Sequence, residues 1–345
     1  MVEADVVIIG AGLSGLVAAT ELTQRGRNVV IVDQEPAASL GGQAWWSFGG
    51  LFLVDSPEQR RLGVHDDAQL AFSDWLSSAQ FHPGAEQGEG PDRHGYAWAK
   101  SYIEFASGPM RTWLHRLGVR WFPLVQWAER GGYHAGGHGN SVPRFHVTWG
   151  TGPGLLAPFL TAAKAAREEG LLRLFFRHKV TKITMTAGSI SGVVADVLAP
   201  DPAERGYPSS RTVVGQRQIS APAVIIASGG IGANHDLVRS LWPHGQLPKQ
   251  FLSGVPNSID GSMIPVAQAV GADFIHSSRM WHYPEGIAMH TPIWSHHGVR
   301  ILPGPSSLWL DADGHRLPAP LYPGFDALGA LEHITTNHHD HSWMV

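Results

Sequence analysis

The feature that most constrains the fold is a spaced glycine triplet placed directly after an apolar run near the start of the chain. Residues 5–9 read Asp-Val-Val-Ile-Ile, and Gly10, Gly12 and Gly15 follow. β-Branched residues favour a strand, and glycines at this spacing form the turn from a strand into a dinucleotide-binding helix. Gly10 permits the turn, Gly12 lets a diphosphate approach the backbone, and Gly15 lets helix and strand pack closely. The pattern predicts a Rossmann-like start, with an anion bound at the helix N-terminus.

An acidic residue ends the second predicted strand, which covers 29–32. Asp33 follows Gly10 by 23 residues, close to the roughly 20 expected between a glycine turn and the acid that binds ribose hydroxyls. A glycine turn that binds nothing is the alternative, but this triplet has every contextual element of the motif. The sequence therefore predicts a dinucleotide site.

A second glycine-rich segment follows the acidic residue. Gly41, Gly42 and Gln43 precede a tryptophan pair, and Ser47, Gly49 and Gly50 come after it. Dense glycines let backbone amides lie against a flat ring or a phosphate, although a plain glycine loop has the same composition. Because nicotinamide dehydrogenases usually continue with another strand and helix at this point, the order of segments favours FAD. A nicotinamide-only dehydrogenase remains the alternative, and a flavin absorbance spectrum would exclude it.

Size and composition limit the function classes. The chain has 345 residues, of which 43% are hydrophobic and 16% charged, so it is long enough for two globular domains. Its formal charge of −4 leaves no basic excess for nucleic acid, and the absence of cysteine excludes disulfides and thiolate metal sites. No secretory signal and no apolar run of bilayer length are found, so we expect a cytoplasmic protein without a membrane span.

The rest of the chain alternates predicted helices and strands. The predicted helices cover 67–76, 108–118, 155–169 and 262–270, with a surface loop at 82–95. The predicted strands cover 174–183, 190–195 and 223–226, with a polar excursion at 200–208. The last strand runs into Ala227, Ser228 and Gly229, and ligands in open α/β sheets bind beyond the carboxyl ends of strands.

Histidines are the remaining candidates for chemistry. His134, His138 and His146 fall within thirteen residues, but their spacing matches no compact ligand set, and we expect no metal site. The histidine-rich stretch 337–341 could suggest a metal site, but a motif needs structural context, and the stretch is interpreted as an interrupted loop. His146 is a candidate for contacting a polar group of a substrate, and a purely structural loop histidine is the equally open alternative.

Together these segments resemble the flavoprotein superfamily of fumarate reductase, succinate dehydrogenase and 3-ketosteroid Δ1-dehydrogenase, and most closely bacterial FAD-binding dehydrogenases. The resemblance rests on Gly10, Gly12, Gly15, Asp33, 41–43, 49–50, 227–230 and 257–261. It implies an α/β fold: a Rossmann-like FAD-binding domain with an inserted, incomplete α+β capping domain for the substrate. The expected division is 1–55 for the first part of the FAD-binding domain, 56–140 for an insertion of helices and loops, 141–272 for the continued FAD-binding domain, and 273–345 for the start of the capping domain.

The resemblance also implies the residues that bind FAD. The first glycines and Asp33 hold the ADP half, backbone near Val180 meets adenine, and Ser47 to Gly50 lie beside the isoalloxazine. The predicted cofactor residues are Gly10, Gly12, Ser14, Gly15, Asp33, Gly41, Gly42, Gln43, Ser47, Gly49, Gly50, Val180, Ala227, Ser228, Gly229 and Asp260.

The implied reaction is an FAD-dependent dehydrogenation of a CH–CH bond next to a carbonyl, in a steroid-like or other hydrophobic ketone. In the related enzymes a histidine at the position of His146 contacts substrate, and a capping-domain tyrosine near Tyr322 acts as the base. Tyr322 would remove a proton α to the carbonyl while the neighbouring carbon gives a hydride to the flavin. A capping-loop tyrosine exposed to solvent is the equally open alternative for Tyr322. The expected partner is a small hydrophobic substrate, and the sequence does not predict the electron acceptor.

Three departures from the family pattern bear on this expectation. The capping segment lacks the glutamate and arginine that deliver protons in fumarate reductases, since it reads Arg-Leu-Pro-Ala-Pro-Leu-Tyr over 316–322. After Phe122 and Pro123 the chain has Leu124 where ketosteroid dehydrogenases carry tyrosine. The family's chains also run further, so we expect a truncated protein with weak flavin retention. The alternatives are an inactive or partial flavoprotein fragment and a fumarate reductase-type enoate reductase.

Overall fold

The glycine turn follows β2 (Val6–Ile9), one of the two central strands of a parallel sheet. The computed structural model describes residues 2–243, 247–248, 251–302 and 306–345. The predicted strand–helix–strand start is confirmed as β2 (Val6–Ile9), α1 (Leu13–Gln24) and β3 (Val29–Asp33). The parallel sheet has the order β11–β2–β3–β7, with β11 at Ala223–Ile226 and β7 at Leu172–Phe176. β2 and β3 therefore lie side by side, and their carboxyl ends meet at one edge.

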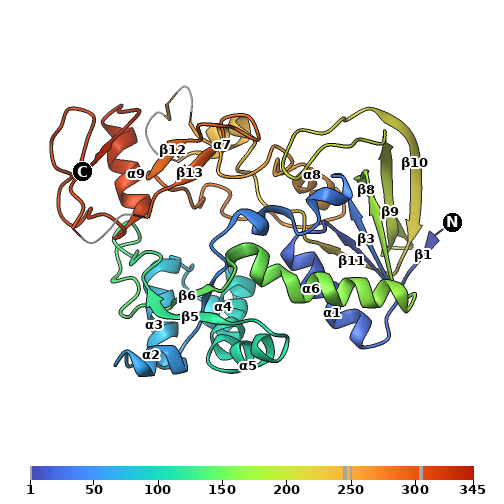
Figure 1. Cartoon of the computed structure of the whole chain (residues 1–345), viewed down its shortest axis with the longest axis horizontal. Coiled ribbons are helices and arrows are strands. Elements are labelled where there is room, and N and C mark those ends of the chain that lie inside the picture. Colours follow the sequence, from blue (N-terminus) through green and yellow to red (C-terminus); the bar gives the residue numbers. More distant parts are fainter. Residues whose placement is uncertain (1, 244–246, 249–250, 303–305) are drawn as a thin grey trace.

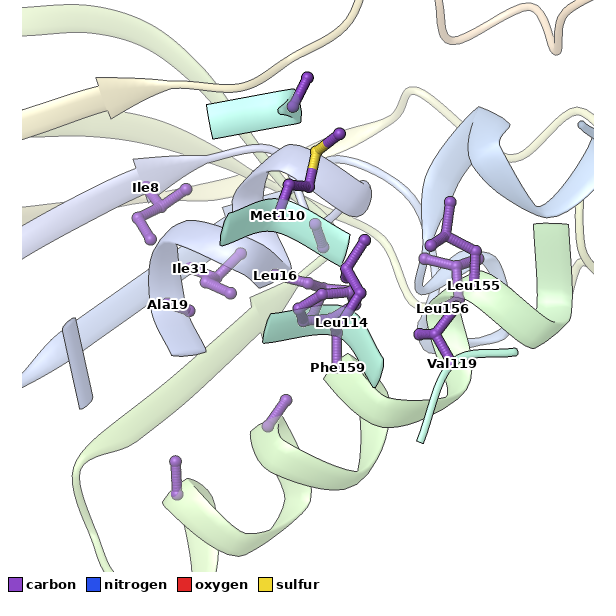
Figure 2. Packing of buried hydrophobic residues seen from close by; sticks show 14 of the residues in the cluster. Ile8, Leu16, Ala19, Ile31, Met110, Leu114, Val119, Leu155, Leu156 and Phe159 are labelled. Atoms are coloured by element: carbon purple, nitrogen blue, oxygen red, sulfur yellow. The ribbon is translucent and has the colours of Figure 1, made fainter. Parts of the chain in front are cut away.

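Both faces of this sheet are buried, because alternate residues of a strand point to opposite sides. Ile8 and Ile31 belong to one core with residues of α1 and α6 (Thr151–Glu168), among them Leu16 and Phe159 (Figure 2). The residues between them, such as Val7 and Val30, belong to a separate core on the other face. The chain thus forms three layers, with helices, a parallel sheet and a second sheet, and Figure 1 shows α1 and α6 beneath the sheets.

The second sheet has the order β1–β10–β9–β8 and is antiparallel except where β1 (Val2–Glu3) pairs with β10 (Val213–Ser220). Its remaining strands are β8 (His178–Thr186) and β9 (Ser189–Leu198). The predicted single strand at 174–183 is wrong, because Arg177 adopts a φ of 60° and turns the chain from one sheet into the other. β10 was not predicted, since its middle, 215–218, carries no apolar side chain and so breaks the apolar pattern.

The segment between the two halves of the parallel sheet adds helices and a small sheet. The helices are α2 (Pro57–Arg61), α3 (Ala68–Ala79), α4 (Arg93–Ala106) and α5 (Pro109–Arg116). The small sheet has the order β4–β6–β5, with β4 at Gly50–Phe52, β6 at Phe145–Thr148 and β5 at Trp121–Gln126. Ile103, Met110 and Leu114 join the core formed by α1 and α6, so this insertion packs directly on the helical layer. The small sheet takes strands from both sides of the expected boundaries at 55 and 141, which stay a prediction.

The C-terminal part occupies the opposite end of the molecule from the second sheet (Figure 1). Its elements are β12 (Gly286–Ala288), β13 (Gly298–Arg300), β14 (Trp309–Leu310), α9 (Ala327–Thr336) and β15 (Trp343–Met344). The two helices before it are α7 (His235–Leu241) and α8 (Met263–Gln268), and Met263 of α8 packs in the core shared with the second sheet. A small separate core of Trp309, Leu317, Leu321, Ala330 and Ile334 joins β14, α9 and the loop between them. Among the described residues, none of the helices has the length and apolar character needed to cross a bilayer.

Candidate cofactor site

A cavity of about 550 Å³ opens at the carboxyl ends of β2, β3 and β11. Its wall is formed by segments that are far apart in the sequence, as expected for a ligand site in an open α/β sheet. Of the predicted cofactor residues, those lining it are Gly10, Gly12, Ser14, Asp33, Gly42, Gln43, Val180, Ala227, Ser228, Gly229 and Asp260. Most of the predicted contacts are thus brought together around one cavity.

The three glycines of the first turn have different roles. A Cβ atom on Gly10, whose φ is +108°, would lie 2.4 Å from the carbonyl oxygen of Ala227, and a Cβ on Gly15 would lie 2.1 Å from the carbonyl oxygen of Gly10. These two glycines therefore permit close packing. Gly12 differs, because no atom of the described residues lies within 4 Å of the position of its Cβ. Its missing side chain leaves open space in the cavity wall.

The N-terminus of α1 faces this open space. Gly12 is the N-cap residue, no side chain caps the helix, and the first turn carries no acidic residue. The first N–H groups of a helix have no partner within the helix, and its dipole favours an anion there. Gly12, Leu13 and Ser14 all line the cavity. This arrangement fits a diphosphate.

Asp33 fixes the glycine turn and still faces the cavity. Its Oδ2 accepts a hydrogen bond from the backbone N–H of Ala11 at 2.7 Å, and its Oδ1 accepts one from Glu35 at 2.8 Å. Burial raises the pKa of the Asp33 carboxyl, while the two backbone N–H groups act in the opposite direction. Each carboxylate oxygen can accept a further hydrogen bond, so Asp33 keeps the capacity to bind a ribose hydroxyl.

The second glycine segment packs directly on the first. The backbone N–H of Gly41 donates to the carbonyl of Ala11 at 2.9 Å, and its φ of +101° suits only glycine well. A Cβ on Gly42 would lie 3.0 Å from the Cα of Gly12. The short 3₁₀-helix that starts at Gly42, η2 (Gly42–Trp46), therefore brings Gln43 and Trp46 into the cavity wall.

Five predicted cofactor residues do not line this cavity. Gly15 and Gly41 position the two glycine segments as described above. The Ser47 hydroxyl donates to the carbonyl of Ala44 at 2.8 Å and accepts from the Gly49 N–H at 3.0 Å. A Cβ on Gly49 would lie 2.4 Å from the Thr151 carbonyl oxygen, and one on Gly50 would overlap the ring of Phe145. The contact of Ser47, Gly49 and Gly50 with the flavin ring stays a prediction.

The segment between β9 and β10 supplies lining residues that sequence reasoning missed. We call residues 199–212 the strap, because this segment runs from the second sheet back to the end of β3. Arg177 donates to Gln34 and to the strap residue Ser209, and Arg211 of the strap pairs with Glu35 at 2.5 Å. The strap residues that line the cavity are Arg205, Gly206, Tyr207, Pro208 and Arg211. Its polar composition is that of an ordinary surface loop, so the sequence carries no signal of this role.

Arg205 places a cation in the cavity wall. Its Nη1 donates to the carbonyl of Leu40 at 2.7 Å, and its guanidinium lies 3.9 Å from the centroid of the Trp45 ring. Burial lowers the pKa of Arg205. No carboxylate pairs with it among the residues that the structure describes. A positive group without a protein anion suits a cavity whose ligand carries phosphate.

His146 lies inside the small sheet and is fully buried. Its Nδ1 contacts the carbonyl of Arg144 at 2.8 Å, and its Nε2 contacts the Ser56 hydroxyl at 2.7 Å. A neutral ring satisfies both contacts, and burial lowers the pKa of the imidazole. The structure therefore supports the structural alternative for His146, and its geometry gives no support to a contact with substrate.

Tyr322 lies in the loop before α9 and is 39% exposed. Its ring packs edge-on against Phe325, with centroids 5.6 Å apart, and the guanidinium of Arg316 lies 6.0 Å from the ring centroid. Tyr322 is not among the residues that line the cofactor cavity. Its role as a base stays a prediction.

Asp311, Asp313 and His315 present ligand atoms close enough together to hold a metal ion, although no metal site was predicted there. Asp313 and His315 are exposed, and Oδ1 of Asp311 accepts hydrogen bonds from the backbone N–H groups of both. These contacts explain the cluster as a turn.

The cavity fits FAD on four observations: the open space at Gly12, the uncapped helix N-terminus, the acid at the end of β3, and the cation of Arg205, with which no carboxylate of the described residues pairs. The first three match the requirements of an ADP group, and the fourth balances phosphate charge.

Comparisons with known proteins agree with this reading of the cavity. The model of the FAD binding domain family matches residues 5–345. A KsdD-like steroid dehydrogenase of Mycolicibacterium smegmatis is 55% identical over 100% of this chain and 62% of its own length. One of Mycobacterium tuberculosis is 55% identical over 99% of this chain and 59% of its own length. The chain thus spans about 60% of the length of these curated relatives.

Solved structures show the same fold at low identity. The 3-ketosteroid-Δ4-(5α)-dehydrogenase of Rhodococcus jostii RHA1 superposes with a TM-score of 0.67 at 19% identity, covering 98% of this chain and 65% of that one. A flavocytochrome c3 fumarate reductase superposes with a TM-score of 0.65 at 22% identity, covering 94% of this chain and 49% of that one. The predicted fold class and the FAD cofactor are confirmed by these matches. The chain belongs to the FAD binding domain family of flavoproteins.

Proposed function

We propose that this protein is an FAD-dependent dehydrogenase that acts on a CH–CH bond next to the carbonyl of a steroid-like or other hydrophobic ketone. The observation that carries the redox part is the cavity formed by Gly12, α1 and Asp33, which fits FAD. The substrate class is supported by the 55% identity, over the whole chain, to proteins named as steroid dehydrogenases.

The residues of this chain would divide the work of binding and proton transfer. Bound FAD supplies the hydride acceptor. The N-terminus of α1 and Arg205 would hold the diphosphate, and Asp33 would hold the ribose. The strap, which the ion pair of Arg211 with Glu35 holds at the end of β3, would close the cavity over the nucleotide and exclude water. Tyr322 is our proposed base, to take the proton α to the carbonyl.

Anaerobic reduction of the flavin tests this function. The protein is loaded with FAD, mixed without oxygen with 4-androstene-3,17-dione, and followed by the loss of flavin absorbance in the visible range. We expect reduction by the steroid ketone, and none by succinate, the substrate expected of a fumarate reductase-type enzyme running in the oxidative direction. Reduction by succinate alone would reject the ketone assignment.

A second measurement tests the base. Tyr322→Phe should abolish reduction by the ketone while the absorbance spectrum of bound FAD stays that of the wild type. Retained reduction in this variant would reject Tyr322 as the base without affecting the cofactor assignment. Tyr133→Phe is a matched control, since Tyr133 is also an exposed tyrosine near the start of α9.

A further inference from the structure

A second cavity, of about 300 Å³, lies between α3, β4 and the segment 129–131. In Figure 1 the loop between β5 and β6, which contains this segment, runs from α3 toward the start of α9. Its aromatic wall consists of Phe52, Trp75 and Trp281, and its polar wall consists of Asp74, Glu129, Arg130 and Asn140. A cavity that is mostly apolar with a few convergent polar groups is typical of small-molecule sites.

The aromatic wall is a preformed surface. The rings of Phe52 and Trp75 have centroids 6.1 Å apart, and both contact Tyr102, at 6.1 and 5.6 Å. This cluster fixes the two rings without a ligand. Trp281 is 54% exposed, so that part of the wall is open to solvent. Aromatic faces of this kind bury a large apolar area of a flat or ring-shaped molecule.

In the polar wall, only one of the two carboxylate oxygens of Glu129 has a hydrogen-bond partner among the described residues. Asp74 is fully engaged, because it accepts hydrogen bonds from Arg144 at 2.6 Å and from the Ser141 hydroxyl at 2.7 Å, and contacts His138 at 2.9 Å. Glu129 is 8% exposed, and its Oε1 accepts from the backbone N–H of Ala327 at 2.6 Å. Its Oε2 is buried and has no hydrogen-bond partner among the described residues. Buried polar atoms are normally paired, so this oxygen requires an explanation.

The charged groups around Glu129 influence the pKa of its carboxyl. Asp326 and Glu285 face it with like charge, and Arg300 faces it with opposite charge. Burial has the largest effect, and together these influences raise the pKa of Glu129 to about 7. Tyr283 also interacts electrostatically with Glu129, and the Arg300 guanidinium lies 3.6 Å from the centroid of the Tyr283 ring. The carboxyl therefore exists in both protonation states near neutral pH.

The cavity adjoins both segments assigned to the reaction. The N–H of Gly131 donates to the carbonyl of Phe325 at 2.5 Å, and the Arg130 guanidinium lies 5.2 Å from the ring centroid of Phe325, which itself packs on Tyr322. On the other side, Phe52 ends β4, the strand that starts at Gly50 beside the expected place of the flavin ring. The second cavity thus lies between the loop of the proposed base and the segment expected to contact the flavin.

We propose that the second cavity is the substrate subsite, and that Oε2 of Glu129 hydrogen-bonds the carbonyl oxygen of an apolar ketone whose rings lie on Phe52, Trp75 and Trp281. This inference rests on the proposed function. A ketone oxygen only accepts hydrogen bonds, so it pairs with the protonated carboxyl and is repelled by the carboxylate. Binding of the ketone should therefore weaken as the pH rises through about 7.

Calorimetric titration of the FAD-loaded protein with 4-androstene-3,17-dione tests the contact with Glu129. From one pH unit below the pKa of Glu129 to one unit above it, the affinity of the wild type should fall by about tenfold. Glu129→Gln keeps an acceptor for the Ala327 N–H and places a permanent donor at the other position, so its affinity should not change with pH. Glu104→Gln is the control, since Glu104 is exposed on α4 and should leave the wild-type pH dependence intact.

A pair of tryptophan variants tests the location. Trp281 and Trp343 are both 54% exposed, but only Trp281 lines the second cavity. Trp281→Ala should weaken binding of the steroid at least tenfold, and Trp343→Ala should not change it. Both should bind FAD like the wild type, because neither residue lines the cofactor cavity.

The outcomes separate this inference from the proposed function. Wild-type protein that binds the ketone, with the same affinity and pH dependence in Trp281→Ala and Glu129→Gln, would overturn the subsite and leave the substrate class standing. Wild-type protein that binds FAD but shows no binding of the ketone at either pH would overturn the proposed substrate class, and the subsite with it.

Discussion

The carboxylate of Asp33 accepts a 2.7 Å hydrogen bond from the backbone N–H of Ala11, which ties the end of β3 to the glycine turn after β2. The same carboxylate also accepts from the N–H of Glu35. Asp33 thus holds two backbone segments at the cofactor cavity in place, at Ala11 and at Glu35, without a bound ribose. These two hydrogen bonds explain why the dinucleotide-binding motif carries an acidic residue at the end of β3. Substitutions in the glycine turn therefore test the cofactor site.

Gly12→Ala should separate FAD binding from stability. The backbone of Gly12 has φ of −76°, which alanine adopts freely, and in the part of the chain that the structure describes no atom lies within 4 Å of the added Cβ. We expect an unchanged free energy of unfolding and an FAD affinity at least about tenfold lower, because the methyl group occupies space expected for the diphosphate. Chemical denaturation and titration with FAD provide the two measurements.

Gly15→Ala is the contrasting variant, since its Cβ would lie 2.1 Å from the Gly10 carbonyl oxygen. We expect it to destabilise the fold by roughly 1–3 kcal/mol or more through overpacking. If Gly12→Ala lost as much stability as Gly15→Ala, the open space at Gly12 would be disproved.

Arg205→Met should weaken FAD binding through charge. A charged hydrogen bond contributes about 1.5–3 kcal/mol, which predicts a loss of affinity of roughly tenfold to a hundredfold. The affinity of the variant should also depend less on salt, since one cation near the diphosphate is removed. Titrations with FAD at low and high salt measure both effects.

Arg25→Met is the control for Arg205, because Arg25 is an exposed arginine at the C-cap of α1 that pairs with Glu21. A salt dependence that is equal in Arg205→Met and the wild type would show that Arg205 does not face the phosphates.

Arg144→Met should lower the free energy of unfolding more than a substitution on the surface does. Arg144 is buried between Asp66 and Asp74, with contacts of 2.7 and 2.6 Å. Removing it leaves two buried carboxylates without their cation, and breaking a buried pair costs about 3–5 kcal/mol. Urea denaturation measures the change. A loss below about 1 kcal/mol, as for exposed pairs, would contradict the burial of this network.

Glu129 should make stability depend on pH. Its pKa is about 7 in the folded protein and 4.5 in the unfolded chain. A raised pKa stabilises the fold below the unfolded value, and this contribution is lost as the pH rises from 4.5 through 7. The free energy of unfolding should fall by roughly 3 kcal/mol across this window relative to Glu129→Gln.

Denaturation of both proteins at several pH values gives this difference, in which the other titrating groups cancel. Parallel curves for the wild type and Glu129→Gln would show that the Glu129 carboxyl is not buried as described.

Much of the cofactor half could be predicted because it depends on local rules. The glycine spacing, the β-branched strands and the acid at Asp33 each act through backbone conformation or short-range packing, and the structure places them as expected. The strand predicted across Arg177 failed for the opposite reason: the apolar pattern continues through it, and only pairing with two different sheets shows that the chain turns there.

By itself, the sequence determined the glycine turn, the parallel strands and the FAD site, because these follow from the conformational freedom of glycine and from hydrophobic burial along continuous segments. Only the tertiary structure decided that His146 is buried with contacts on both ring nitrogens, that Arg205 reaches the cofactor cavity from the strap, and that Glu129 has a half-satisfied carboxyl among the described residues. Those properties depend on which distant segments meet. Burial and charge environment are set by neighbours in space, and a single sequence does not specify those neighbours.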